Sequence, residues 1–385
     1  MAAYSLMMAG TSLMVLLAGI IGTEFAPSTD LATLPIALVV VGVAASTLPT
    51  GKLLHRFGRR RVFIAYGFIA IAAALMAMQS LIFGSFTGFC FAAVMMGWSG
   101  AAGHQYRFAA LEAVPAEMAP KATSFLLLGG IMAAFVGPEL AVRGRGLLST
   151  EYAGSFLLLT LSYIAGMVII SFYRDVESRQ SDHHGGGRRL SEILRSPVII
   201  LAISAAALGY AVMSFIMTAT PISMHMHAGH SLETTKFVIQ SHIAAMYLPA
   251  LIFAWLFGKL GVRGMMWAGV IVYLVCLGIA ALNTEFLNYW LALVLLGIGW
   301  NFLFLSGTNL LPLGYRREER FRVQSMNDFL VFSIQAIVSL SSGWFLFHWQ
   351  WQGLLFACIP LVLGFSILLC FIRETHIRLE VLEQS

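Results

Sequence analysis

The sequence predicts an all-α membrane protein, and three observations support this fold class. Of the 385 residues, 59% are hydrophobic, and the mean hydropathy is +0.84. Only 11% are charged, whereas soluble domains average roughly 25%, so a water-facing surface could not be covered. The apolar residues gather in blocks of about 20, the length that a helix needs to cross roughly 30 Å of hydrocarbon. Lipid is therefore expected to surround most of the exterior.

Divided at its charges and at clusters of Gly, Pro and Asn, the chain contains twelve predicted transmembrane helices. The first six cover residues 4–22, 31–50, 62–80, 86–113, 121–142 and 152–173. The second six cover residues 197–219, 236–258, 264–282, 286–312, 323–347 and 352–372. The polar stretch SRQSDHHGGGRRLSE between the two sets is typical of a flexible linker. The predicted parts are an N-terminal six-helix bundle (1–174), a cytoplasmic linker (175–196), a C-terminal six-helix bundle (197–375) and a cytoplasmic tail (376–385).

The distribution of Lys and Arg predicts the orientation in the membrane. Of the 23 such residues, all but Arg143, Arg145 and Lys236 lie on one side of the predicted spans. Cytoplasmic loops carry this kind of excess, so both termini and the linker are expected on the cytoplasmic side of a bacterial inner membrane. The net charge of +5 then reflects topology, and no nucleic-acid partner is expected.

The sequence lacks the residue patterns that several kinds of chemistry need. The four cysteines lie in apolar stretches without CxxC spacing, which favours packing over metal, redox or disulfide roles. His183 and His184 stand beside a Gly run with no third ligand nearby, and they are interpreted as solvated linker residues. No GxxxxGK[ST] run occurs, which argues against a nucleotide-driven pump. We expect no cofactor, no bound metal and no enzyme activity.

An internal repeat links the two halves of the chain. Residues 51–67, GKLLHRFGRRRVFIAYG, align with residues 254–270, AWLFGKLGVRGMMWAGV, at an offset of 203 positions. This alignment places Gly58 on Gly261 and Arg60 on Arg263. Two pseudo-symmetric six-helix bundles joined by a central linker are the architecture that a rocking transporter needs.

The segment GKLLHRFGRRR resembles the loop signature GxLxDRxGRRxxL of the major facilitator superfamily. The matching residues are Gly51, Leu53, Arg56, Gly58, Arg59 and Arg60, whereas His55 replaces the usual Asp. The stretch LEAVPAEMAPKA resembles the family's acidic pattern at the end of the fourth helix, with Glu112 as the acid. The resemblance covers the whole chain and implies the family fold of twelve helices, with a central cavity built from helices 1, 4, 7 and 10. Two further stretches resemble a little-characterised bacterial branch.

In that family, the signature's Asp is thought to latch the second helix against the eleventh. Because this Asp is absent here, we predict an inverted latch in which Arg56 or His55 pairs with Asp328. The alternative is a solvated positive loop. In the fourth helix, His104 and Arg107 share a face at i,i+3. Arg107 is expected either to contact the solute or gate, or to form a structural pair with a carboxylate.

Aromatic and polar side chains in the second half suggest a site for a planar or amphipathic organic solute. The expected substrate-binding residues are His104, Arg107, Tyr210, His242, Tyr247, Trp300 and Asn301. Thr218, Gln240 and Phe304 lie on the same group of helices. Ordinary helix packing is the alternative for each single aromatic.

The candidates for proton coupling are Glu139, His225, His230, His242 and Asp328. Glu139 could instead pair with Arg143 one turn further on. The run MHMHAGHS could bind a soft metal, but one short loop favours a structural or proton-sensing role.

Together these patterns predict a secondary active transporter, a proton symporter that works by alternating access and acts as a monomer. The expected solute is a small organic metabolite, such as a flavin-like vitamin or a siderophore-like chelator. The alternatives are a drug or metabolite exporter and, from another class, a transporter-like receptor without flux.

Overall fold

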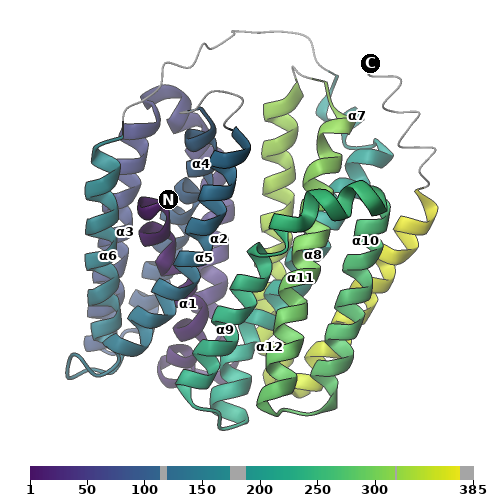
Figure 1. Ribbon diagram of the computed structural model, residues 1–385. Coiled ribbons are helices and arrows are strands. Elements are labelled where there is room, and N and C mark those ends of the chain that lie inside the picture. Colours follow the sequence, from purple (N-terminus) through teal and green to yellow (C-terminus); the bar gives the residue numbers. More distant parts are fainter. Residues whose placement is uncertain (113–118, 174–187, 317–318, 373–385) are drawn as a thin grey trace.

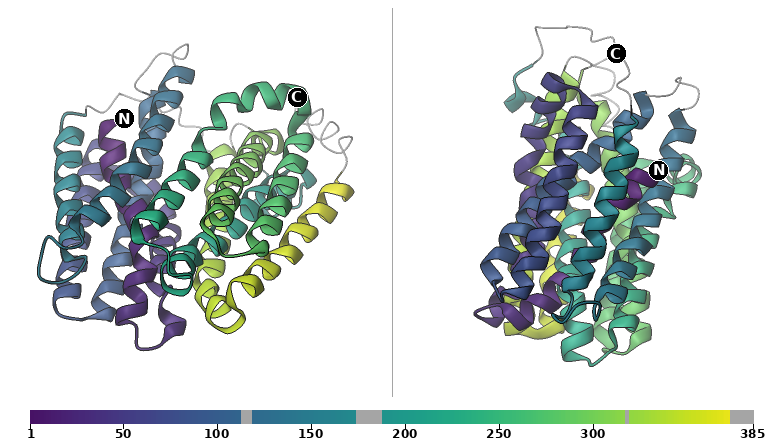
Figure 2. Two further views of the ribbon diagram at one scale, coloured as in Figure 1. Left: turned by 60° about the horizontal axis from the view of Figure 1, so that its bottom comes forward. Right: turned by 90° about the vertical axis from the view of Figure 1, so that its left-hand side faces the viewer.

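The computed structural model describes residues 1–112, 119–173, 188–316 and 319–372, and every regular element in these ranges is helical. Figure 1 shows two bundles of long helices side by side, α1–α6 and α8–α12. The left view of Figure 2 also shows two groups of helices that lie against each other. The all-α fold class is therefore confirmed.

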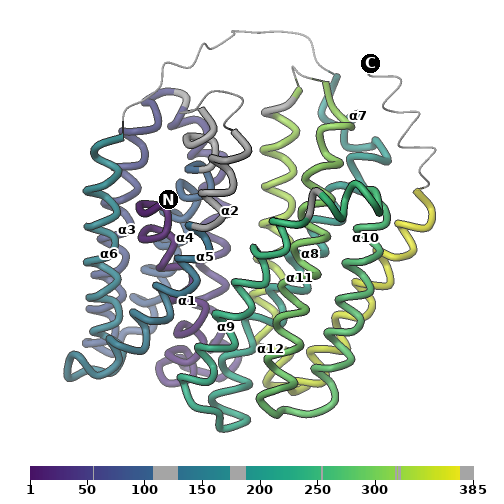
Figure 3. The backbone as a smooth tube through the Cα atoms, viewed as in Figure 1, coloured from purple at the N-terminus to yellow at the C-terminus, as the bar shows by residue number. Residues whose placement is uncertain are grey.

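The N-terminal bundle contains six long helices, one for each predicted span. They are α1 (Ala2–Phe25), α2 (Leu34–Phe57), α3 (Arg59–Ile82), α4 (Phe86–Glu112), α5 (Ala119–Gly144) and α6 (Ala153–Ser171), with the short η1 (Thr29–Leu31) before α2. Figure 3 marks in grey the part of α4 and α5 whose side chains are not described.

The C-terminal bundle follows a short surface helix. Its elements are α7 (Leu190–Ile193), α8 (Pro197–Ile222), η3 (Ser223–His227), α9 (Leu232–Tyr247), α10 (Ala250–Leu282), α11 (Phe286–Leu310), η4 (Leu311–Gly314) and α12 (Arg320–Phe371). Below, the linker face is the end of the molecule where the described chain stops at Tyr173 and resumes at Arg188. The far face is the opposite end.

Two helices in this bundle change direction inside their bounds. The backbone of α10 leaves the helical region at Gly261, and that of α12 leaves it at Gln350. The helix α12 therefore contains both the eleventh and the twelfth predicted spans. By length and composition, nine helical stretches in the described part of the chain can cross a membrane, and the 50-residue stretch 322–371 is one of them.

The eighth span differs from the prediction of one continuous helix over 236–258. The helix α9 ends at Tyr247, and helical structure resumes only at Ala250. Pro249 explains the interruption, because proline has no N–H to continue the hydrogen-bond ladder. The span is thus a 16-residue helix followed by a differently directed segment.

The internal repeat is visible in the backbone at the linker face. Gly58 has a φ of 80° and its counterpart Gly261 has a φ of 67°, a region that favours glycine. Two residues later, Arg60 donates to the carbonyl of Ser171 at 2.8 Å, and Arg263 donates to the carbonyl of Leu369 at 2.6 Å. Each arginine thereby binds the negative C-terminal end of its bundle's last helix. Its partner in this contact is a backbone carbonyl and not an acidic side chain.

Candidate functional site

Five aromatic side chains from four helices of the C-terminal bundle meet about midway between the two faces. This aromatic cluster consists of Tyr210 (α8), Tyr247 (α9), Trp300 and Phe304 (α11), and Phe332 (α12). Trp300 is only 4% exposed, and the other four are half-buried. Half-buried aromatic rings are the kind of surface that lines solute sites in proteins.

The cluster has a defined geometry. The rings of Trp300 and Phe304, one turn apart on α11, stack at 4.9 Å with an angle of 14° between their planes. The ring of Tyr210 stands edge-on to Trp300 at 5.3 Å, to Phe304 at 5.4 Å and to Phe332 at 5.6 Å. Such offset and edge-on pairs stabilise one another by about 0.5–1.5 kcal/mol each beyond burial. The cluster is therefore a preformed surface.

Trp300 also carries an unsatisfied polar group. Its Nε1 is buried and makes no hydrogen bond within the described part of the protein. Most buried donors in proteins have a partner, so this indole N–H calls for an explanation. A carbonyl or ring nitrogen of a bound solute would satisfy it.

The N-terminal bundle reaches the cluster through His104 of α4. The His104 ring lies 5.5 Å from the ring of Phe332. This contact joins the two bundles at the depth of the cluster, as expected for a solute site at their interface. The side chain of Arg107, the other residue predicted on this face, lies outside the described residues. Phe332 was not among the predicted site residues, although it lies four positions after Asp328 on the same helix.

His242 and Asn301 lie beside the cluster, in the contact between α9 and α11. His242 Nδ1 bonds the carbonyl of Leu293 at 2.8 Å, and Asn301 Nδ2 donates to the carbonyl of Met246 at 2.7 Å. Between these bonds, a Cβ on Gly297 would lie 2.6 Å from the His242 carbonyl, so the two backbones touch. Both polar residues thus hold two closely packed helices together.

The signature loop lies at the linker face. Arg56 is exposed, with its guanidinium 5.2 Å from the Phe57 ring, and Arg59 reaches the carbonyl of Gln105 at 3.5 Å. Asp328 accepts a hydrogen bond from Asn327 at 3.0 Å and makes further interactions. The side chains of His55 and Glu112 lie outside the described residues. The predicted latch to Asp328 remains a prediction.

Glu139 lies near the far face and has two cationic partners. It accepts from Arg143 at 3.0 Å, the pair suggested by the sequence, and from Lys236 of α9 at 2.9 Å. Lys236 also contacts Glu233 at 2.7 Å. This network joins the two bundles, which the sequence did not predict for Lys236.

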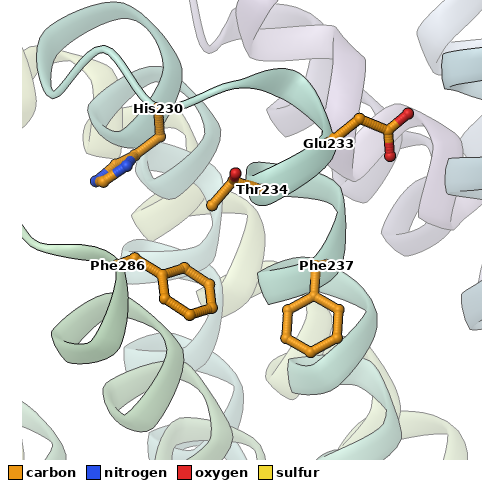
Figure 4. Close-up of a pocket in the computed structure, with 5 residues that line it drawn as sticks. All are labelled: His230, Glu233, Thr234, Phe237 and Phe286. Carbon is orange, nitrogen blue, oxygen red and sulfur yellow. The ribbon is translucent and has the colours of Figure 1, made fainter.

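The histidines after α8 stabilise a turn at the same face. His225 Nδ1 bonds the carbonyl of His230 at 2.8 Å, and His230 Nε2 bonds the carbonyl of Thr284 at 2.9 Å. Figure 4 shows His230 and Thr234 above the rings of Phe237 and Phe286, with Glu233 pointing away. These residues line an open groove of about 440 Å³. It lies at the far ends of α9 and α11, remote from the aromatic cluster, so it is not the candidate solute site.

A second ionic site fastens the chain at the linker face. Arg188 donates to Glu319 through Nε at 3.1 Å and through its terminal nitrogen at 2.8 Å, and its backbone N–H donates to the same carboxylate. The Glu319 side chain is fully buried. Hydrogen bonding to Arg188, above all, lowers the pKa of Glu319 from 4.5 to about 2. Sequence reasoning missed this pair, because nothing local connects residues 131 positions apart.

Comparison with known proteins agrees with this architecture. Residues 1–239 match the family model of the Major Facilitator Superfamily. The chain is 33% identical over 353 residues to the riboflavin transporter RfnT of Brucella anthropi, covering 91% of this chain and 88% of that protein. It is 29% identical to YdeG of Bacillus subtilis, described as an uncharacterized MFS-type transporter, over 84% of this chain and 79% of the relative.

The fold is also similar to solved structures. A bacterial homolog of the human lysosomal transporter Spinster, in an inward-facing and occupied conformation, aligns with a TM-score of 0.71 at 13% identity. The alignment covers 100% of this chain and 95% of that one. The inward-facing and unoccupied form gives a TM-score of 0.72. On the matched family model and the 33% identical relative, this chain belongs to the Major Facilitator Superfamily.

Proposed function

We propose that this protein is a secondary active transporter that carries a planar aromatic vitamin of the riboflavin class across the bacterial inner membrane. The aromatic cluster is the observation that carries this proposal. A stacked pair of rings, with Tyr210 edge-on to both, suits the flat face of an isoalloxazine ring. The unpaired Nε1 of Trp300 offers a donor to a carbonyl on such a ring system. The riboflavin transporter of Brucella anthropi, similar over nearly the whole chain, supports the same solute class.

Alternating access is the proposed mechanism. The cluster lies where the bundles meet, and His104 of one bundle contacts Phe332 of the other. Rocking of two similar bundles about this level would expose the solute to each face in turn. We assign the linker face to the cytoplasm, since most Lys and Arg residues lie on that side of the spans.

The proton gradient is the proposed energy source. The sequence contains no nucleotide-binding motif, and one proton crossing the membrane supplies about 2.3 kcal/mol per 100 mV. The candidates for carrying the proton remain Glu139, His225, His230, His242 and Asp328. Of these, Glu139 on α5 and Asp328 on α12 are carboxylates on helices that contact the opposite half.

Uptake of radiolabelled riboflavin into proteoliposomes tests the proposal. We expect accumulation when the outside is acidic and its loss when a protonophore is added. Trp300→Ala should raise KM about tenfold, because one aromatic stacking contact contributes roughly 1–3 kcal/mol. Trp349→Ala is the matched control, since that indole is 55% exposed and lies outside the cluster.

The solute, the proton coupling and the position of the site can each be refuted separately. Absence of riboflavin flux in the wild-type protein would refute the solute assignment, and saturable binding without flux would favour a receptor. Flux that ignores the protonophore would refute proton coupling. Equal effects of the two tryptophan substitutions would refute the placement of the site.

A further inference from the structure

Helices α8 and α12 carry a row of polar side chains beside the aromatic cluster. The two helices pack against each other and both begin at the linker face, so they run parallel. Gln335 Nε2 of α12 donates to Ser214 Oγ of α8 at 2.6 Å. One turn further toward the far face, the hydroxyls of Thr218 and Ser339 bond at 3.0 Å. These four residues are called the polar row below.

The end of the polar row nearest the far face is closed. Thr218 is 7% exposed and Ser339 is fully buried, and each hydroxyl has the other as its partner. Next to them, the buried Ser342 donates to the carbonyl of Phe215 at 2.7 Å. Bonds of this kind hold helices together inside a membrane. This end of the row is therefore structural.

The end of the polar row nearest the cluster is different. Gln335 is half-buried, and only its Nε2 is bonded. Within the described part of the chain, its Oε1 has no hydrogen-bond partner. Ser214 is 5% exposed, and its own proton has only the sulfur of Met213 at 3.9 Å, a weak acceptor. Ser214 thus fixes one side of the Gln335 amide and leaves a carbonyl oxygen for another donor.

Gln335 lies directly next to the rings of the cluster. It follows Phe332 by three positions, so the two side chains share a face of α12 and are separated by a rise of about 4.5 Å. On α8, Ser214 follows Tyr210 by four positions in the same way. A ring stacked on the cluster would therefore direct a substituent toward Gln335 when that substituent extends toward the far face.

The chemistry of the polar row restricts this substituent. None of its four residues carries a charge, so a phosphate or carboxylate entering the row would lose hydration without gaining a counter-charge from it. A hydroxyl can donate to an amide carbonyl and accept from another hydroxyl. The row therefore matches a short, neutral chain that carries several hydroxyl groups.

We propose that Gln335 recognises the hydroxylated chain of the solute, and that Ser214 is the residue that positions it. A solute hydroxyl donates to Gln335 Oε1 while the ring of the solute stacks on the aromatic cluster. The carrier is then specific for a planar ring that bears a neutral sugar-alcohol chain, and not for the ring alone. This inference rests on the proposed function, because it concerns a second part of the same solute.

Binding of two flavins to the purified full-length protein tests the proposal. The probes are riboflavin and lumiflavin, which has the same ring with a methyl group in place of the chain, and quenching of flavin fluorescence measures the dissociation constant. We expect the wild type to bind riboflavin about tenfold more tightly than lumiflavin. Gln335→Met keeps the size of the side chain, and it should weaken riboflavin binding about tenfold while leaving lumiflavin binding unchanged.

Three further variants separate recognition from packing. Ser214→Ala should weaken riboflavin binding about threefold and spare lumiflavin, and it provides the same measurement if Gln335→Met does not fold. Trp300→Ala removes the ring surface that both flavins share, so it should weaken both. The matched control is Gln324→Met, because Gln324 lies on α12 but donates to the Tyr315 hydroxyl at the linker face. It should leave the ratio of the two affinities unchanged.

The outcomes distinguish this inference from the proposed function. If the wild-type protein neither binds nor transports riboflavin, the proposed function fails. If it transports riboflavin but binds lumiflavin equally well, the polar row does not recognise the chain. If Gln335→Met weakens both flavins to the same extent, Gln335 only holds α8 against α12. The proposal is equally wrong if Gln324→Met lowers the preference for riboflavin as much as Gln335→Met does.

Discussion

The buried ion pair between Arg188 and Glu319 should contribute measurably to stability. Glu319 is fully buried and Arg188 is 27% exposed, so solvent screens the pair only weakly. Replacement by Gln keeps the size of the side chain and removes its charge. We therefore expect Glu319→Gln to destabilise the protein at neutral pH.

The size of this effect follows from the pKa of Glu319. The pKa of Glu319 is about 2, against an ordinary 4.5. At 1.36 kcal/mol per pKa unit, the ionised carboxylate stabilises the folded protein by about 3 kcal/mol. With an unfolding entropy of about 2.1 cal/mol/K per residue, a chain of 385 residues would lose roughly 4 °C in melting temperature.

The sign of the pH dependence is also determined. Because the folded pKa is lowered, the stabilisation is fully present above about pH 4.5 and is lost as the pH falls toward about 2. The difference between the wild type and Glu319→Gln should thus be constant from pH 8 to pH 5 and should shrink on further acidification.

Thermal unfolding in detergent can be followed with a thiol-reactive dye, because three cysteines become accessible only on unfolding. These are Cys90, Cys276 and Cys358, and the exposed Cys370 is replaced by Ser. The control is Glu151→Gln, which removes an exposed pair with Arg145 and should cost about 0–1 kcal/mol. If both variants melt at the same temperature, the assignment of a stabilising buried pair is wrong.

Two further predictions concern helix packing and helix ends. Gly297→Leu should prevent folding or lower the melting temperature strongly, since its Cβ would lie 2.6 Å from a backbone oxygen, whereas Gly278→Leu, with nothing within 4 Å, should be tolerated. Expression yield and the dye assay distinguish these outcomes. Arg263→Ala should destabilise by about 1 kcal/mol through the loss of its bond to the end of α12, and Arg60→Ala should do the same at α6. If neither arginine substitution lowers the stability of the protein, these arginines do not cap the helix ends.

The sequence was most informative about the long helices. Hydropathy is a local signal, so the boundaries of the predicted spans agree with most helices to within a few residues. The repeat was also visible, because the glycines at 58 and 261 are needed for a backbone conformation that side chains disfavour. The interrupted eighth span was missed although Pro249 is plain in the sequence, since membrane helices often tolerate proline when neighbouring helices satisfy the backbone.

The candidate site was only partly predictable. Tyr210, Tyr247 and Trp300 were expected to bind solute, and the structure brings these three together. His242 and Asn301 were grouped with them. Both lie in the adjacent helix–helix contact, and their role in binding stays a prediction. Hydrophobic periodicity cannot separate these cases, because a helix surrounded by protein and lipid has no polar face to mark the cavity side.

The two halves of the chain are alike in their loops at the linker face, but they differ at the depth of the aromatic cluster. At the linker face they use the same glycine and the same arginine, which fix the loop and the end of the last helix in each bundle. At mid-depth, the rings of the aromatic cluster come from the C-terminal half, whereas the N-terminal half contributes His104 and the backbone surface at Gly130. Under the proposed function, a carrier built this way would hold a flat solute on one bundle while the other bundle moves past it. His104 and Tyr247 contact both the cluster and the opposite bundle, so we expect their replacement to alter both the rate of transport and the affinity for the solute.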